Sequence, residues 1–179
     1  MKTLSKYLLV TFLSLALFSC KSDDEGNVEF DLSNTNIAGT YDMTMLTYSA
    51  TGSVEVNGVP VETSIEGVGD TFQIDFVFND NGTYAATGEY RGTTVVTSGG
   101  NSETDTEIII MNDTGTYAIA GDAMLTLTPA GDEQSIYAST YTVTRFTQTE
   151  IYLTVDETVP PEDNFGIDHI QSEIRFKRK

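Results

Sequence analysis

Apolar and polar residues alternate one by one along most of the chain after residue 37, and no segment there shows a helical period. Four apolar side chains occupy every second position in one run: Phe72, Ile74, Phe76 and Phe78. Successive side chains of a strand point to opposite faces, so we expect one buried face and one wet face. The same alternation recurs around Leu125, Tyr141, Ile151 and Ile174. The pattern predicts a single antiparallel all-β domain.

Short turn signals separate these runs. The sequence NDNGTY at 79–84 nearly repeats as NDTGTY at 112–117. Asn and Asp tolerate turn conformations and Gly supplies a positive φ, so both copies predict tight hairpins. Asn57 and Gly58 predict a third hairpin, and Pro60 confines its second strand to an edge or a bulge. The Ser- and Thr-rich stretch around Gly99 and Gly100 is interpreted as a flexible connection.

The first 19 residues have the pattern of an export signal. Lys2 and Lys6 precede an apolar run at 7–18, which ends at Ser19 and Cys20. The run is shorter than the roughly 20 apolar residues that a transmembrane helix needs. Residues 17–20 resemble the bacterial lipoprotein box, which implies that the Cys20 thiol is acylated and becomes the mature N-terminus. The alternative is an ordinary secretory signal beside a chance cysteine.

Residues 20–36 are predicted to be the acylated N-terminus and a flexible acidic tether, because they are polar and lack apolar periodicity. The sequence at 21–25 resembles the short acidic signal that sends some Gram-negative lipoproteins to the outer face of the outer membrane. We therefore expect a lipid-anchored protein at the cell surface. Cys20 is the only cysteine, so its acylation would leave no thiol for disulfides, metal sites or nucleophiles.

The negative net charge of the chain limits the classes of molecule that it can bind. Nine lysine and arginine residues stand against 27 acidic residues, and signal cleavage would remove two of the nine. A surface this negative gains no affinity from counterion release by a nucleic acid, and it is repelled by anionic headgroups. Nucleic acid is therefore excluded as a partner, and the membrane contact that remains is the lipid on Cys20.

The chain offers little catalytic or metal-binding chemistry. His169 is the only histidine, and no nucleophile with an orienting acid is assignable beside it. The oxygens of residues 79–82 are candidate calcium ligands, but no acid at a twelfth loop position closes the shell, which favours a hairpin turn. We expect no enzyme activity, no cofactor and no metal.

Arg145 is the first candidate for ligand binding. On the predicted alternation it shares a face with Tyr137, Tyr141 and Val143. A cation inside an apolar barrel would receive a ligand carboxylate, whereas near a strand end it would reach solvent and pair with a surface acid. With Phe76 as part of the apolar lining, the predicted ligand-binding set is Arg145, Tyr137, Tyr141 and Phe76.

Several segments together resemble the lipocalin-like domains of surface lipoproteins. They are Gly39 to Tyr41, Phe78 to Tyr84, Gly115 to Tyr117, Leu125 to Leu127, Tyr141 to Leu153 and Arg175 to Lys177. The resemblance covers residues 37–179 and implies an up-and-down antiparallel barrel of about eight to nine strands. The lipocalin opening has Trp two residues after the Gly, whereas this chain has Tyr41. The family's late-strand arginine packs on that aromatic, and Arg175 is the nearest match, although its alternation with Ile174 points it outward.

Two functions follow from this prediction. A barrel with an apolar lining holds a small apolar or amphipathic ligand in its mouth, which is the first hypothesis. The second is a cell-surface interaction module, whose outer face or loops bind a protein or glycan partner without an internal ligand.

Overall fold

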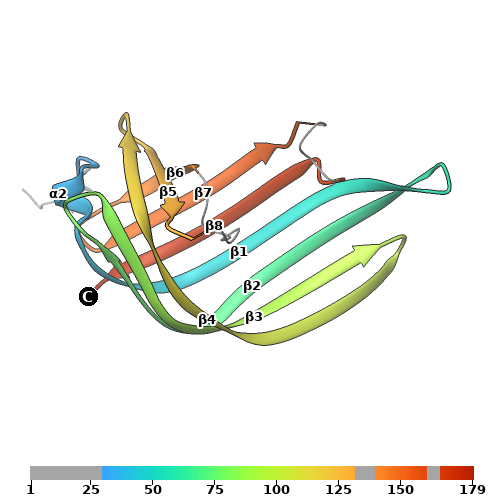
Figure 1. The fold of residues 1–179 in the computed structure, drawn as a ribbon, viewed down its shortest axis with the longest axis horizontal. Coiled ribbons are helices and arrows are strands. Elements are labelled where there is room, and N and C mark those ends of the chain that lie inside the picture. Colours follow the sequence, from blue (N-terminus) through green and yellow to red (C-terminus); the bar gives the residue numbers. More distant parts are fainter. Residues whose placement is uncertain (1–29, 132–139, 161–165) are drawn as a thin grey trace, which may run out of the picture.

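The computed structural model describes residues 30–131, 140–160 and 166–179, and within them eight antiparallel strands form one closed ring (Figure 1). The ring follows chain order, with each strand beside the next and β8 beside β1. Its strands are β1 (Gly39–Val56), β2 (Val59–Phe78), β3 (Thr83–Ser98), β4 (Asn101–Ala120), β5 (Met124–Pro129), β6 (Thr140–Phe146), β7 (Glu150–Thr158) and β8 (His169–Arg178). The predicted all-β up-and-down barrel is confirmed.

Two-residue turns build the two long hairpins. Asn57 and Gly58 have φ of 55° and 79° and join Val56 to its partner Val59, as predicted. Gly99 and Gly100, with φ of 56° and 83°, join β3 to β4 in the same way. The interpretation of these two glycines as a flexible connection was wrong, because paired positive φ values make the tight turn that matches strand twist.

Only one copy of the repeated turn sequence is a turn. Gly82 has φ of 82°, and the Asn79 N–H donates to the Thr83 carbonyl at 2.8 Å. The second copy, at 112–117, lies inside β4, where Gly115 pairs with Tyr84 of β3. A Cβ on Gly115 would lie 2.3 Å from the Thr128 carbonyl oxygen of β5 and 2.7 Å from the Tyr84 ring. The second hairpin was therefore predicted wrongly, since this glycine gives room to the β5 backbone and to the Tyr84 ring and does not have a positive φ.

The stretch before β1 packs on one end of the ring. Helix α2 (Asn34–Ile37) is capped by the Ser33 side chain, which accepts from the Asn36 N–H at 3.3 Å. Ile37 is fully buried, and the Phe30 ring contacts Phe146 edge-on at a centroid distance of 5.9 Å. The last residues of the predicted tether thus form part of the domain.

Arg178 fastens the C-terminal strand to this end. Its guanidinium lies over the Tyr41 ring, 5.0 Å from the centroid, and donates to the Tyr41 hydroxyl and to the Asn36 carbonyl. The arginine that packs on the opening aromatic is therefore Arg178, three residues beyond the match chosen from the sequence. Arg175 faces outward, as its alternation with Ile174 indicates.

Aromatic side chains fill the ring beside α2. The Phe76 ring contacts those of Phe78, Tyr84 and Phe176 at centroid distances of 4.8, 5.3 and 4.9 Å. Phe78 contacts Tyr117 edge-on at 5.2 Å. Rings in such tilted, stacked and edge-on arrangements pack closely and add to the apolar burial. This end of the barrel is consequently a solid core.

The other end is open. The hairpins β1–β2 and β3–β4 extend well past β5 and β6 (Figure 1). Strand β5 pairs with β4 only from Gly115 to Ala120. The part of β4 that precedes Gly115 has β3 as its only described strand partner. The sheet is therefore a distorted barrel, closed and filled at one end and spread into a curved sheet at the other.

Candidate functional site

The predicted ligand-binding residues do not form one site. Phe76 and Tyr141 are both fully buried in the aromatic core. Burial raises the pKa of the Tyr141 hydroxyl, which therefore stays neutral at physiological pH. Tyr137 lies outside the described residues. The two described aromatic residues of the set thus serve as packing.

Arg145 lies on the outer wall because β6 has a register shift. Val143 pairs with Leu153, but Arg145, two residues later, pairs with Tyr152, only one residue earlier on β7. One extra residue in β6 reverses the side-chain alternation. The Arg145 side chain is accordingly exposed, and its Nε lies 2.8 Å from a Glu150 carboxylate oxygen. The structure thus has the surface ion pair that was the alternative in the sequence.

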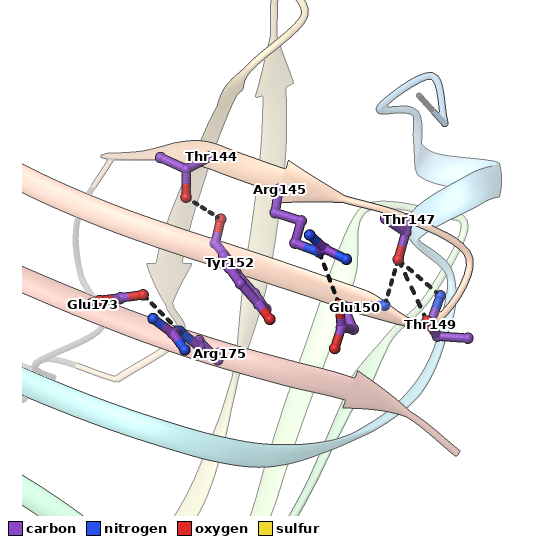
Figure 2. A network of polar contacts seen from close by, with 8 residues as sticks. All are labelled: Thr144, Arg145, Thr147, Thr149, Glu150, Tyr152, Glu173 and Arg175. Carbon is purple, nitrogen blue, oxygen red and sulfur yellow. Dashed lines mark hydrogen bonds and ion pairs between the residues drawn. The ribbon is translucent and has the colours of Figure 1, made fainter. Parts of the chain in front are cut away.

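The side chains of Arg145, Tyr152 and Arg175 form a row across β6, β7 and β8 on this outer face (Figure 2). Tyr152 pairs in register with Arg145 on one side and Arg175 on the other. The two guanidinium carbons lie 5.5 and 4.7 Å from the centroid of the Tyr152 ring. Arg175 also donates to Glu173 at 2.7 Å, and this hydrogen bond raises the pKa of Arg175. Each cation therefore has its own carboxylate, so the row offers no uncompensated positive charge to a ligand.

A hollow of about 820 Å³ adjoins Arg145 and Tyr152. Its lining includes Phe30 and Leu32, which precede α2, and Asp122, from the turn between β4 and β5. Apolar rings and carboxylates share this lining with Arg145.

The concave face of the open half is apolar. From the buried Leu46, every second residue of β1 faces the inside of the ring, and this series reaches Val54 and Val56. Their partners on β2 are Val61 and Val59. Directly opposed residues of an antiparallel pair share a face, so all four valines line the same surface. That surface continues the core face beyond the point where the ring closes.

These apolar side chains are open to solvent. Val54 and Val96 are each 40% exposed, and Val59 is 61% exposed. Val96 of β3 opposes Ile65 of β2, which extends the surface across a third strand. Neighbouring exposed apolar side chains on a soluble domain are typical of a binding surface. We name Val54, Val56, Val59, Val61, Ile65 and Val96 the valine floor.

Glycines mark the boundary between the filled and open halves. Tyr48 opposes Gly67, and a Cβ on Gly67 would overlap the Tyr48 ring. The Tyr48 hydroxyl is 2.7 Å from the Thr94 hydroxyl. A Cβ on Gly69 would lie 2.9 Å from the Phe72 ring. The missing side chains let aromatic rings lie across the sheet and close off the core.

Three carboxylates border the valine floor on β4. Glu103, Asp105 and Glu107 oppose Val96, Thr94 and Gly92 of β3 and therefore share the concave face. All three are exposed. An apolar surface with an acidic border suits a ligand with an apolar body and without negative charge.

His169 is the first residue of β8, and it has an acidic partner that the sequence did not identify. Its Nε2 is 2.7 Å from an Asp156 carboxylate oxygen, across β7 and β8. The hydrogen bonds from His169 and Gln171 hold the pKa of Asp156 below its usual value. Among the residues that the structure describes, no group of three or more His, Cys, Asp or Glu side chains is placed to hold a metal ion.

The fold and the site define a class: an aromatic-cored, ring-closed antiparallel β-domain with an exposed apolar face at its open end. No family model, curated protein or solved structure matches the chain. In the described ranges, no helix has the length and apolar character needed to span a membrane.

The sequence predicted the hairpin that carries Val54, Val56, Val59 and Val61, but it predicted neither their exposure nor the addition of Ile65 and Val96 to the same surface. The alternation at 54–61 predicts a hairpin with one apolar face, and every other hairpin of the chain has one too. Among the described residues, β5 and β6 are too short to reach that face. The exposure could be predicted only from the relative lengths of the strands, and the local sequence pattern predicts strand ends less reliably than strand existence.

Proposed function

We propose that this protein is a non-catalytic, lipid-anchored surface protein that binds a small apolar or amphipathic ligand on the valine floor. The observation that carries the proposal is the continuation of the core face into the open half, where its valines are exposed. The proposed anchor is the acylated Cys20, which lies outside the described residues.

The filled end of the ring favours the floor over the barrel interior. A ligand at the centre would displace Phe76 or its ring partners, which pack at 4.8 to 5.3 Å. Removal of a buried phenylalanine from its packing costs about 3 to 5 kcal/mol. A ligand on the floor meets no such penalty, because its binding surface already exists. The filled interior argues against the first hypothesis from the sequence in its internal-ligand form, so the proposed binding surface is the exposed floor at the mouth of the barrel.

The area of the floor sets the expected affinity. Covering roughly 200 Å² of apolar surface contributes about 5 kcal/mol. Association also costs translational and rotational freedom. We therefore expect dissociation constants of about 1 mM or weaker for a small neutral probe, and tighter ones for a larger ligand that also reaches the carboxylate border.

A fluorescence titration with N-phenyl-1-naphthylamine, a neutral apolar dye, tests the proposal. Val54→Thr and Val96→Thr keep shape and strand propensity but make the floor polar. We expect each to weaken binding about fourfold, the equivalent of one buried methyl group. The matched control is Val68→Thr, since Val68 is 49% exposed on the opposite face of β2, where it opposes Thr47.

Unchanged dye binding in the two floor variants, or an equal loss in the Val68 control, would refute the site. The anchor is tested separately by Cys20→Ser, which should move the protein from the membrane fraction to the soluble fraction. Protease treatment of intact cells should remove the domain if it faces outward, and full protection would contradict surface display.

A further inference from the structure

The strand β4 has a long edge without a described strand neighbour. From residue 101 to residue 110 it pairs with β3 on one side, and its ladder with β5 begins only at Gly115. A strand segment of this length spans about 33 Å. Such an edge presents a row of backbone donors and acceptors to a further strand.

The turn before β4 fixes which backbone groups face outward. Ser98 and Asn101 flank the two-residue Gly99–Gly100 turn, so they exchange backbone hydrogen bonds. Hydrogen-bonded and non-hydrogen-bonded pairs then alternate along β4, with the odd-numbered residues bonded to β3. The even-numbered residues therefore point their N–H and C=O groups away from β3. The Thr106 N–H follows this pattern, because it donates to the Asp105 carboxylate at 2.8 Å and not to β3.

The two faces of this edge differ sharply. Ile108 and Ile110 are 59% and 77% exposed on the outer face. Glu103, Asp105 and Glu107 line the concave face, and none has an ion pair with a described lysine or arginine. A second copy of this chain is a poor partner here, because two such edges would bring their carboxylate rows together.

We propose that this edge binds an extended basic segment of a partner protein by β-strand addition. Backbone hydrogen bonds to the even-numbered residues hold the added strand in register, except at the Thr106 N–H, which donates to Asp105. Alternate lysine or arginine side chains of the partner then face the three carboxylates, and the residues between them cover Ile108 and Ile110. The inference does not depend on the valine floor, since it rests on the edge of β4 and not on the concave apolar surface.

The competing explanation is that the carboxylates only protect the edge from aggregation. In that case the edge binds no basic strand, and neutralising the carboxylates makes the protein self-associate. Strand addition instead makes the carboxylates attract a partner, so the two explanations predict different results.

The probe is a fluorescein-labelled, end-capped heptapeptide of alternating lysine and valine, followed by fluorescence anisotropy on the full chain. A glutamate and valine heptapeptide of the same length is the control and should not bind. We expect saturable binding that weakens as salt is added, because exposed ion pairs are screened.

Substitutions at Thr104 test the backbone contacts. Thr104→Pro removes an outward N–H without removing a bond to β3, and proline is tolerated on edge strands. We expect at least a tenfold loss of peptide affinity, with no change in the matched variant Thr104→Val. Equal binding by the proline variant, with a native circular dichroism spectrum, would overturn strand addition.

Charge variants test the partner chemistry without disturbing the backbone. The combined variant Glu103→Gln, Asp105→Asn and Glu107→Gln should bind the peptide about tenfold more weakly, from three cross-strand ion pairs.

The matched control neutralises three exposed acids on the β1–β2 hairpin and has the same net charge: Glu55→Gln, Glu62→Gln and Glu66→Gln. An equal effect of the two triple variants would show non-specific attraction and overturn the proposal. Absence of peptide binding to the wild-type chain, together with self-association of the edge variant, would establish the protective role instead.

Discussion

Replacing Arg178 should measure how strongly the C-terminal strand closes the barrel. Its guanidinium donates to the Tyr41 hydroxyl and to the Asn36 carbonyl, and it covers the Tyr41 ring at 5.0 Å. Hydrogen bonds from a charged donor are worth about 1.5 to 3 kcal/mol each, and a cation over a ring adds about 0.5 to 2 kcal/mol. These contacts link β8 to β1 and to the end of α2.

The buried Nε of Arg178 reduces the stabilisation that these contacts provide. The Arg178 Nε is buried and has no hydrogen-bond partner, so its desolvation offsets part of the contacts. For Arg178→Met we therefore expect a net loss of about 3 kcal/mol in the free energy of unfolding. That is a large share of the 5 to 15 kcal/mol typical of a domain. Urea denaturation followed by far-UV circular dichroism measures it.

The control is Lys177→Met on the same strand. Lys177 is exposed and has no ion pair among the described residues, so its replacement should change the unfolding free energy by less than about 0.5 kcal/mol. Combining Arg178→Met with Tyr41→Phe should give a coupling of about 1 kcal/mol or more. Additive effects, or an Arg178 loss no larger than that of the Lys177 control, would refute the closing role of Arg178.

Two further perturbations test the core. Gly88→Ala should destabilise the domain by about 3 kcal/mol in thermal or urea unfolding, since its φ is +132° and a Cβ would overlap the Gln73 carbonyl oxygen. Gly58→Ala, with φ of +79° but open space around it, should cost only about 1 kcal/mol, and equal costs would contradict the steric argument. Burial raises the pKa of Tyr41 and Tyr141 above the ordinary value of 10.0. The folded state therefore favours the neutral hydroxyls, their contribution is complete below pH 10, and unfolding titrations should show stability falling as pH rises above it. A stability that stays flat from pH 9 to pH 12 would contradict this.

The local sequence pattern predicted the structure correctly where a residue type has a single structural role. The alternation through Phe76 and Phe78 predicted a strand with one buried face, and both rings are in the core. Asn57 and Gly58 predicted a turn because few other pairs adopt two positive φ values without strain. The repeated NDxGTY sequence led to a wrong prediction, because a glycine such as Gly115 serves either a turn or a close approach, and its neighbours Thr128 and Tyr84 decide between the two.

A change of parity separates Arg145 from the rest of the predicted ligand-binding set. The sequence left Arg145 either inside the barrel, counting from Tyr141, or at the surface beside an acid, and one extra residue in β6 places it on the outer wall. The arginine that packs on Tyr41 is Arg178, which the same counting did not select. A bulge has no reliable signal in a single sequence, and it reverses every side chain that follows.

The sequence by itself determined that this chain forms an antiparallel all-β domain, because alternation and turn residues act over a few neighbours. It also determined the strongly acidic composition, which limits the partners. Only the tertiary structure decided that the ring is solid at one end and that the valines at the other end stay in solvent. Those outcomes depend on which strands run past their neighbours and how far, a matter of contacts between residues far apart in the chain.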